Sequence, residues 1–245
     1  EYISERRISS LHITFCNKQE YSFFSKSGFL KRLGKQFHWY NQGYSNFDDF
    51  LDHLTSRKRK AIRKERRAAN EGVKIETLSG KDLKESHLDA FYDFYLNTVD
   101  KKWAHAYLTR DFFSILRERL AEKVILFLAT KNQEPIAAAL NLRGEETLYG
   151  RNWGCSVQWP MLYFELCFYR AIDYAIEENL KRVEAGAQGT HKISRGYLPS
   201  ETFSAHWIKH KGFEEAVSKF LDQEQKDTEA EMLFLEKSRS PYKQS

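Results

Sequence analysis

Cysteine and proline are scarce in this 245-residue chain, which contains three cysteines and four prolines. Cys16, Cys155 and Cys167 form no Cys-x-x-Cys pair, and an odd number of thiols does not close into a set of disulfides, so a reducing compartment is expected. No apolar run reaches the roughly 18 to 20 residues that cross a bilayer, and the first ten residues lack the apolar region of a secretory signal. These features predict a soluble, cytoplasmic protein without a membrane span.

Two kinds of enzyme signature are also missing from the sequence. No His-Glu-x-x-His stretch and no Cys/His pair with ligand spacing occurs, so no metal site is expected. A Gly-x-Ser-x-Gly turn, which would present a serine nucleophile, does not occur either. The sequence therefore does not support zinc-dependent or serine-nucleophile chemistry.

Aromatic residues and one run of basic residues are abundant. Aromatics make up 15% and hydrophobic residues 41% of the chain, which predicts a folded protein with a sizeable core. The net charge is +5, but residues 57–67 carry eight basic residues and one glutamate, so the rest of the chain is slightly acidic. This run is either a clamp for phosphates or a solvated helix face. Lys58 interrupts the apolar stripe of Leu54 and Ile62, which indicates a helix side that opens on a cleft.

Apolar periodicity and capping residues predict the elements of the chain. The elements expected in the first half are a strand at 9–16, a helix, a strand at 33–43, a long helix at 46–72, a strand at 73–78, and helices at 84–99 and 111–122. Those expected in the second half are strands at 123–130, 136–144 and 147–154, a helix at 160–179, a strand at 182–187, a short helix from Thr190 to Gly196, a strand at 201–208, a helix at 213–223 and an edge strand at 232–236. The sequence thus predicts an α/β fold with a mixed, mostly antiparallel sheet flanked by helices.

This order of elements resembles the GNAT acyltransferase fold, and the resemblance implies a domain organisation. Residues 1–45 are expected to be the C-terminal part of a first GNAT-like domain, and residues 46–72 a basic connecting helix. Residues 73–237 are expected to form a complete GNAT-like domain, with a tail at 238–245. The chain begins at Glu1 rather than Met, so the first GNAT-like domain is expected to be truncated.

The basic run carries a second resemblance. With its flanks it is similar to the segment of Fem-type aminoacyltransferases that joins two GNAT-like domains, through the matching residues Arg59, Ile62, Arg63, Lys64, Gly72 and Val73. Together with the segments GRNWG, FELCFYRAIDYAIE and EAGAQGTHKISRGYLP, it resembles more closely the Fem-like "peptidoglycan biosynthesis/recognition" family. This resemblance implies transfer of an acyl or aminoacyl group to an amine, with acyl-CoA or aminoacyl-tRNA as donor and a tRNA contact through the basic helix.

The segment RNWGCS at 151–156 resembles the pyrophosphate loop of acetyl-CoA-binding GNAT enzymes. Arg151 and Gly154 match that loop, whereas Ser156 replaces its final small residue. Backbone amides in such a loop bind pyrophosphate, but a plain turn between strand and helix explains the segment equally well.

The segment EAGAQGTHKISRGYLP is the strongest candidate for an active site. Its polar residues gather at the start of the expected short helix, which Thr190 is expected to cap. This arrangement suits a phosphate, a carboxylate or the oxyanion of acyl transfer. These residues are Gln188, Gly189, Thr190, His191, Lys192 and Arg195. Leucyl/phenylalanyl-tRNA transferases, which are distant GNAT-fold relatives, place a similar glutamine near the reacting amine, and Gln188 resembles it. The alternative is a tight turn with its polar residues in water.

Glu165 and several aromatic residues complete the candidates. Glu165 is either a general base for an attacking amine or an arginine-paired or solvent-reaching carboxylate. Tyr149, Trp153 and Tyr163 either line an acceptor pocket or belong to the core.

We therefore predict an acyl- or aminoacyl-transferase in cell-wall precursor metabolism. The predicted catalytic residues are Gln188, Glu165 and His191. The predicted substrate- or phosphate-binding residues are Arg151, Gly154, Gly189, Thr190, Lys192, Arg195, Arg57, Lys58, Arg59 and Arg63. The alternative is a non-catalytic GNAT scaffold that binds a polyanion through residues 57–67, and scaffold likeness alone does not separate the two.

Overall fold

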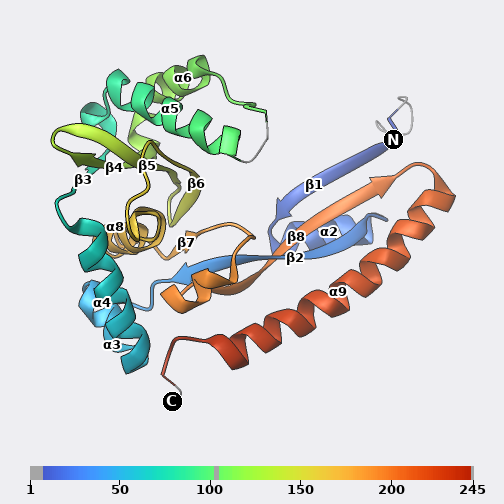
Figure 1. Cartoon of the computed structure of the whole chain (residues 1–245). Coiled ribbons are helices and arrows are strands. Elements are labelled where there is room, and N and C mark those ends of the chain that lie inside the picture. Colours follow the sequence, from blue (N-terminus) through green and yellow to red (C-terminus); the bar gives the residue numbers. More distant parts are fainter. Residues whose placement is uncertain (1–7, 102–104, 244–245) are drawn as a thin grey trace. The chain divides into compact units, whose positions relative to one another are not determined.

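The computed structural model describes residues 8–101 and 105–243 and contains two compact units (Figure 1). The first unit combines residues 1–37 with 198–240, and the second combines residues 38–197 with 241–245. Both units are therefore discontinuous in sequence.

The first unit is a small antiparallel sheet with two helices. Asn17 begins the first helix, because its side chain accepts from the Glu20 amide while the Glu20 carboxylate accepts from the Asn17 amide. The strands are ordered β1-β8-β2, with β1 antiparallel to β8. The elements are β1 (Ser10–Cys16), α2 (Lys18–Lys26), the first part of β2 (Leu30–Tyr40), β8 (Leu198–Ile208) and α9 (Lys211–Arg239).

The edge strand predicted at 232–236 is wrong, because these residues belong to α9. The helix begins where the His210 side chain accepts from the Phe213 amide, and it continues for 29 residues instead of ending at 223. Leu221 and Leu235 are buried and lie 14 residues apart, which is close to four helical turns and places both on one face. None of the helices in the described ranges combines the length and apolar character needed to cross a membrane.

The second unit contains most of the mixed sheet. Its strand order is β2-β7-β6-β5-β4-β3, in which β6 and β7 are parallel and the other neighbouring pairs are antiparallel. The strands after β2 are β3 (Lys74–Leu78), β4 (Val124–Lys131), β5 (Glu134–Arg143), β6 (Thr147–Cys155) and β7 (Arg182–Glu184). The predicted α/β fold class, with its mostly antiparallel sheet, is confirmed. The strands predicted at 123–130, 136–144 and 147–154 are β4, β5 and β6, which form an antiparallel meander.

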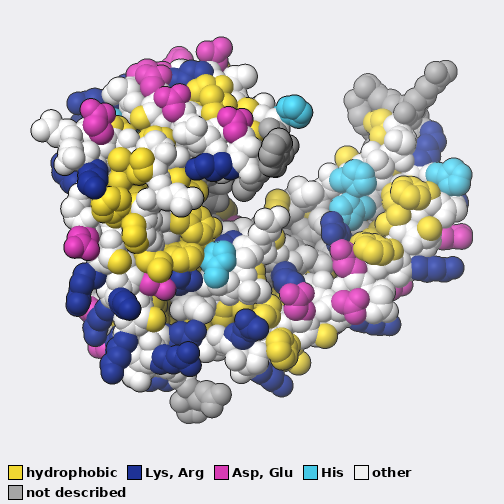
Figure 2. Space-filling view, in the orientation of Figure 1, with side chains coloured by type: hydrophobic (Ala, Val, Ile, Leu, Met, Phe, Trp, Pro, Cys, Tyr) yellow, Lys and Arg dark blue, Asp and Glu magenta, His cyan; other side chains and the backbone are white. Residues whose placement is uncertain are grey.

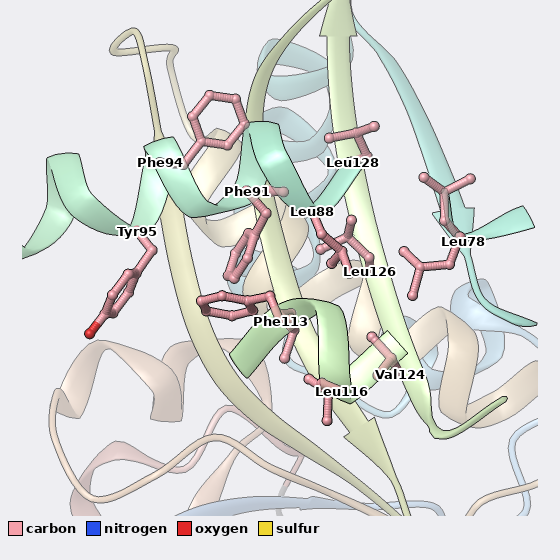
Figure 3. Close-up of a cluster of buried hydrophobic side chains, with 13 residues drawn as sticks. Leu78, Leu88, Phe91, Phe94, Tyr95, Phe113, Leu116, Val124, Leu126 and Leu128 are labelled. Carbon is pink, nitrogen blue, oxygen red and sulfur yellow. The ribbon is translucent and has the colours of Figure 1, made fainter. Parts of the chain in front are cut away.

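Two helices cover one side of this meander and form the core shown in Figure 3. They are α5 (Glu85–Lys101) and α6 (Arg110–Leu120). Leu88, Phe91 and Tyr95 recur at helical spacing on α5 and pack with Phe113 of α6 against strand residues such as Leu126. Short 3-10 turns at Gly80–Asp82 (η1) and Ala121–Lys123 (η2) connect these elements.

The single helix predicted at 46–72 is instead two helices, α3 (Phe47–Asp52) and α4 (Ser56–Asn70). Asn46 caps the first of them by accepting from the Asp49 amide. The break follows from backbone pairing with the C-terminal residues 241–243. The Thr55 amide donates to the Pro241 carbonyl at 2.9 Å, and the Lys243 amide donates to the His53 carbonyl at 3.0 Å. These bonds replace the helical hydrogen bonds that a continuous helix would make.

The helix predicted at 160–179 begins later and is irregular. Met161 has a left-handed backbone, and the helical segment runs through α7 (Leu162–Phe164), a π-helix (η3, Glu165–Tyr169) and α8 (Arg170–Glu177). π-helical turns are rare and are frequent at functional sites. Here Glu165 and Tyr169 lie on the π-helix, and the side chains of both form hydrogen bonds with residues of α4.

Candidate functional site

The parallel strands β6 and β7 stay paired for only three residues each. Thr147–Tyr149 pair with Arg182–Glu184, whereas the rest of β6 up to Cys155 has register partners only in β5 among the described strands, with an irregularity at Arg151. β7 ends at Glu184 and leads through a glycine-containing loop into the 3-10 helix η4 (Thr190–Arg195). The end of β6 and the loop after β7 thus separate here within the second unit.

Aromatic rings connect the three elements around this divergence. Trp153 of β6 contacts Tyr163 of α7, with ring centroids 5.5 Å apart, and Tyr163 contacts His191 of η4 at 6.1 Å. The His191 ring also contacts Phe164 at 5.6 Å and Phe168 at 5.8 Å. The structure therefore brings together the predicted residues Trp153, Tyr163 and His191. We name these three residues, together with Phe164 and Phe168, the His191 cluster. The predicted pocket residue Tyr149 instead lies in the paired part of β6.

Lys192 is buried directly after His191 and is only 4% exposed. Its Nζ donates to the Ala185 carbonyl and, at 3.2 Å, to the Gly186 carbonyl, so it ties η4 to the loop after β7. Burial lowers the pKa of Lys192 to about 8. Burial also lowers the pKa of His191, as do the charges of Arg195 and Lys192, and this favours the neutral imidazole.

Arg195, a predicted ligand-binding residue, is held by the protein through both of its terminal nitrogens. It is 6% exposed, and its Nη2 donates to Glu65 Oε2 of α4 at 2.8 Å while Nη1 donates to the His191 carbonyl at 2.9 Å. Its guanidinium also lies 3.4 Å from the centre of the Phe164 ring. The Tyr169 hydroxyl donates to the same oxygen of Glu65. Arg195 therefore positions the His191 cluster.

Glu165, the predicted general base, is 0% exposed and bound by two arginines. Arg66 of α4 donates to it at 2.9 Å, and Nε of Arg170 lies 3.0 Å from Oε1. Arg66 also forms an ion pair with Asp173 at 2.5 Å. The structure shows the arginine-paired alternative, and this network joins α4 to the π-helix.

The segment predicted as a pyrophosphate loop is largely strand. Residues 151–155 are the last five of β6, and helix α7 begins only at Leu162, so the loop interpretation of Arg151 and Gly154 is wrong. Arg151 is exposed. Packing explains the glycine at position 154, because a Cβ atom there would lie 2.2 Å from the backbone oxygen of Phe94 in α5.

The residues before His191 differ from the expected helix cap. Gly189, with φ of +96°, occupies the cap position of η4. Thr190 is exposed and makes no capping bond, so the prediction that Thr190 caps this helix is wrong. A Cβ atom at Gly189 would lie 2.4 Å from the His191 ring, so only glycine lets that ring fold back over the loop. Gln188 precedes it and is exposed.

The basic helix α4 uses half of its eight cations internally. Lys58 donates to Ser194 Oγ of η4 at 2.9 Å, so this predicted cleft-facing lysine has a hydroxyl partner. Arg59 pairs with Asp52 at 3.1 Å, and Arg63 pairs with Asp48 at 2.8 Å. The fourth cation with a partner inside the protein is Arg66, which pairs with Glu165. Arg57, in contrast, is exposed.

Sequence reasoning missed Glu65, Arg66 and Phe164. Glu65 is the one acidic residue within the basic run 57–67, which is a signal that it has a specific partner. Arg66 and Phe164 carry no comparable local signal, since their partners lie far along the chain.

Two surface cavities of the second unit lie away from the His191 cluster. One, of about 670 Å³, lies along the edge of β3 and is lined by residues such as Asn70, Lys74 and Gln133. The other, of about 480 Å³, lies between α3 and α8 and is lined by residues such as Phe47 and Glu177. Neither is lined by a described residue that the sequence predicted for the site.

Comparison with solved structures supports the GNAT-like fold class. FemX is 12% identical, with a TM-score of 0.63 over 88% of this chain and 76% of that one. L-PGS from Bacillus licheniformis is 11% identical, with a TM-score of 0.57 over 86% of this chain and 73% of that one. The C-terminal domain (DUF2156) of a putative lysylphosphatidylglycerol synthetase from Agrobacterium fabrum is 11% identical, with a TM-score of 0.58 over 87% and 72%. At such identities the likeness shows the fold alone.

Family assignment comes from the sequence. A search of the curated proteins finds no match. A scan against protein families matches the FemAB-like family, described as peptidoglycan biosynthesis/recognition, over residues 1–244. The match extends over nearly the whole chain, and the predicted Fem-like resemblance is thereby confirmed. The chain belongs to the FemAB-like family of peptidoglycan biosynthesis/recognition.

Proposed function

We propose that this protein transfers an acyl or aminoacyl group from a thioester or an aminoacyl ester to an amine in cell-wall precursor metabolism. The observation that carries the proposal is the His191 cluster, which adjoins buried Lys192 where β6 and β7 diverge. Family membership and the acyltransferase-like fold support the reaction type.

The chemistry needs a proton acceptor and a site for negative charge. The amine nitrogen attacks the ester carbonyl, the new C–N bond forms, and the bond to the thiol or hydroxyl leaving group breaks. A neutral imidazole such as His191 accepts the amine proton and returns it to the leaving group. The Lys192 ammonium supplies positive charge near the tetrahedral oxyanion, and exposed Gln188 orients the amine. Because the pKa of Lys192 is about 8, this charge is largely present at pH 7.

Donor identity is tested first by thermal stability with acetyl-CoA, free CoA, aminoacylated tRNA and uncharged tRNA. A ligand at 100 times its dissociation constant adds about 2.7 kcal/mol to stability, which raises the unfolding midpoint. A shift with acetyl-CoA but not with free CoA assigns a thioester donor, and a shift that requires aminoacylation assigns an ester donor. No shift with any of the four contradicts the proposal.

With the donor in hand, His191→Ala is expected to lower kcat about 100-fold, because general-base catalysis contributes that much or more. The matched control is His105→Ala, at an exposed histidine outside the cluster, which should leave kcat within twofold of wild type. Gln188→Ala is expected to raise KM or lower kcat about tenfold. Unchanged turnover in both His191→Ala and Gln188→Ala would assign the chemistry to other residues.

A specific feature of α4 favours polyanion binding as the second candidate function. Arg57, Lys60, Lys64 and Arg67 are exposed, and none has an ion pair in the described part of the chain. Their spacing of three, four and three residues places all four on one helix face, about 15 Å long. Figure 2 shows Lys and Arg side chains gathered over α4. We name this set the α4 cation stripe. It differs from the predicted set, because Arg59 and Arg63 are paired with aspartates.

Replacing all four stripe residues with glutamine is expected to weaken binding of uncharged tRNA and to flatten its salt dependence. Each lost phosphate contact removes about 0.7 to 0.9 from the slope of log K against log salt, so the slope should fall by about 3. Fluorescence anisotropy at several salt concentrations measures it. The control with the same charge change replaces exposed lysines of α9 and its flank, namely Lys209, Lys219, Lys226 and Lys237. Equal slopes for the two variants would exclude the stripe as the contact.

A further inference from the structure

Two histidines face each other on the sheet of the first unit. His12 of β1 lies directly opposite His206 of β8 in the antiparallel register, and their Nδ1 atoms are 2.8 Å apart. Histidine side chains gather over β1 and β8 in Figure 2. Nothing in the proposed transfer reaction uses this pair, which lies outside the second unit.

The outer nitrogen of each ring has its own hydroxyl partner. Nε2 of His12 lies 3.0 Å from Ser10 Oγ, and Nε2 of His206 lies 2.9 Å from Ser204 Oγ. Each serine is two residues before its histidine and therefore on the same face of its strand, so the pattern Ser-x-His occurs on both strands. At 2.8 Å one Nδ1 donates to the other. When that proton is lost and both Nε2 atoms donate to the serine hydroxyls, both Nδ1 lone pairs point into the space between the rings.

We propose that His12 and His206 bind one divalent transition-metal ion through their Nδ1 atoms, with Cu²⁺ as the preferred ion. Imidazole suits Cu²⁺, Ni²⁺ and Zn²⁺, and Cu²⁺ binds a given nitrogen site most tightly of the three. Metal–nitrogen bonds of about 2.0 to 2.1 Å place neighbouring ligands of a square-planar ion about 2.9 Å apart. The Nδ1 atoms already have almost this separation, whereas a tetrahedral ion would need about 3.4 Å.

The charged groups around the pair largely balance one another. Arg32 and Glu224 are the charged side chains that act on His206. Arg32 is itself neutralised by Glu224, which accepts from Nε at 2.8 Å and from Nη2 at 2.7 Å. The serine hydroxyls hold the rings in the orientation that ligation needs, as second-shell partners do in known sites.

The site has two protein ligands, with water in the remaining positions. No group of three or more His, Cys, Asp or Glu side chains able to hold a metal occurs in the described ranges. The ion would join β1, which lies at the end of the described strand order, to its neighbour β8. Binding to the folded state alone would therefore stabilise this edge of the sheet.

The test is a titration of the metal-free full chain with CuCl₂, followed by electron paramagnetic resonance and by the thermal midpoint. One equivalent is expected to bind with two equatorial imidazole nitrogens and to raise the midpoint, and EDTA should reverse the shift. His12→Ala and His206→Ala are each expected to weaken this site at least tenfold. His210→Ala, at a third histidine of the first unit, is the matched control and should retain it.

Three outcomes would overturn the proposal. The first is equal Cu²⁺ affinity in wild type and both single variants, and the second is a spectrum with fewer than two imidazole nitrogens. The third is a loss of Cu²⁺ affinity in His210→Ala as large as the loss in His12→Ala and His206→Ala. Ser10→Ala and Ser204→Ala keep both ligands, and they should weaken binding less than the histidine changes do. Cu²⁺ binding by these serine variants therefore tests the site even where a histidine variant folds poorly.

Discussion

Glu165→Gln is expected to lower the free energy of unfolding by about 3 to 5 kcal/mol. The Glu165 carboxylate is completely buried and neutralises Arg66 and Arg170. Glutamine keeps the size of the side chain but removes its charge, so Arg66 would keep only Asp173 as an ion-pair partner and Arg170 would lose its ion pair with residue 165. Removing one partner of a buried ion pair costs far more than the pair contributes, because the remaining charge stays in a poorly solvated place.

Urea unfolding followed by circular dichroism measures this loss. The matched control is Glu76→Gln on β3, which also removes a glutamate from an ion pair, here with the exposed Lys74. That change should cost no more than about 1 kcal/mol, as is usual for surface pairs. A Glu165→Gln protein as stable as the control would mean that the network is dispensable, and would return Glu165 to the candidates for general base.

Gly154→Ala is expected to cost about 3 kcal/mol, close to the upper end of the range for overpacked sites. The added Cβ atom would lie 2.2 Å from the Phe94 oxygen and 2.4 Å from its carbonyl carbon, both of which are backbone atoms of α5. A flexible side chain could move away, but here strand β6 and helix α5 would have to separate. The Thr98 hydroxyl of α5, which lies within 3.1 Å of the Trp153 carbonyl, would be displaced as well.

The control for this change is Gly150→Ala on the same strand. A Cβ atom there would meet the Glu184 carbonyl at 3.3 Å, which a shift of a few tenths of an ångström relieves. We expect a loss of about 1 kcal/mol or less at this position. Thermal midpoints of the Gly154→Ala and Gly150→Ala variants, measured under the same conditions, test this difference. Equal midpoints would show that β6 and α5 are not in tight contact.

The sheet was largely predictable, because its signals are local. The apolar runs of β4 and β5 are bounded by turn residues, and the two-residue turn at Asn132 and Gln133 closes them into a hairpin with left-handed backbones. The second half of α9 was not predictable in this way. The four apolar residues of the segment MLFLE fit a strand or a helix equally well, and the burial of Leu235 favours the helix.

The candidate site was predictable in residue type but not in contacts. His191 and Lys192 were singled out because glycines and polar residues cluster around them. The roles of Glu165 and Arg195 depend on partners about 100 and 130 residues away, Arg66 and Glu65, and no local pattern reports such distances. The break before α4 likewise depends on Pro241, which is distant in sequence.

The discontinuous division of the chain has a consequence for folding during synthesis. The second unit includes the contacts of residues 241–243, where the Tyr242 hydroxyl donates to the Gly196 carbonyl at 2.9 Å and Pro241 accepts from Thr55. The first unit lacks its middle strand until β8 has been made. Domains usually fold in order as they leave the ribosome. Neither unit here can complete its contacts in this order, because the first needs β8 and the second needs residues 241–243.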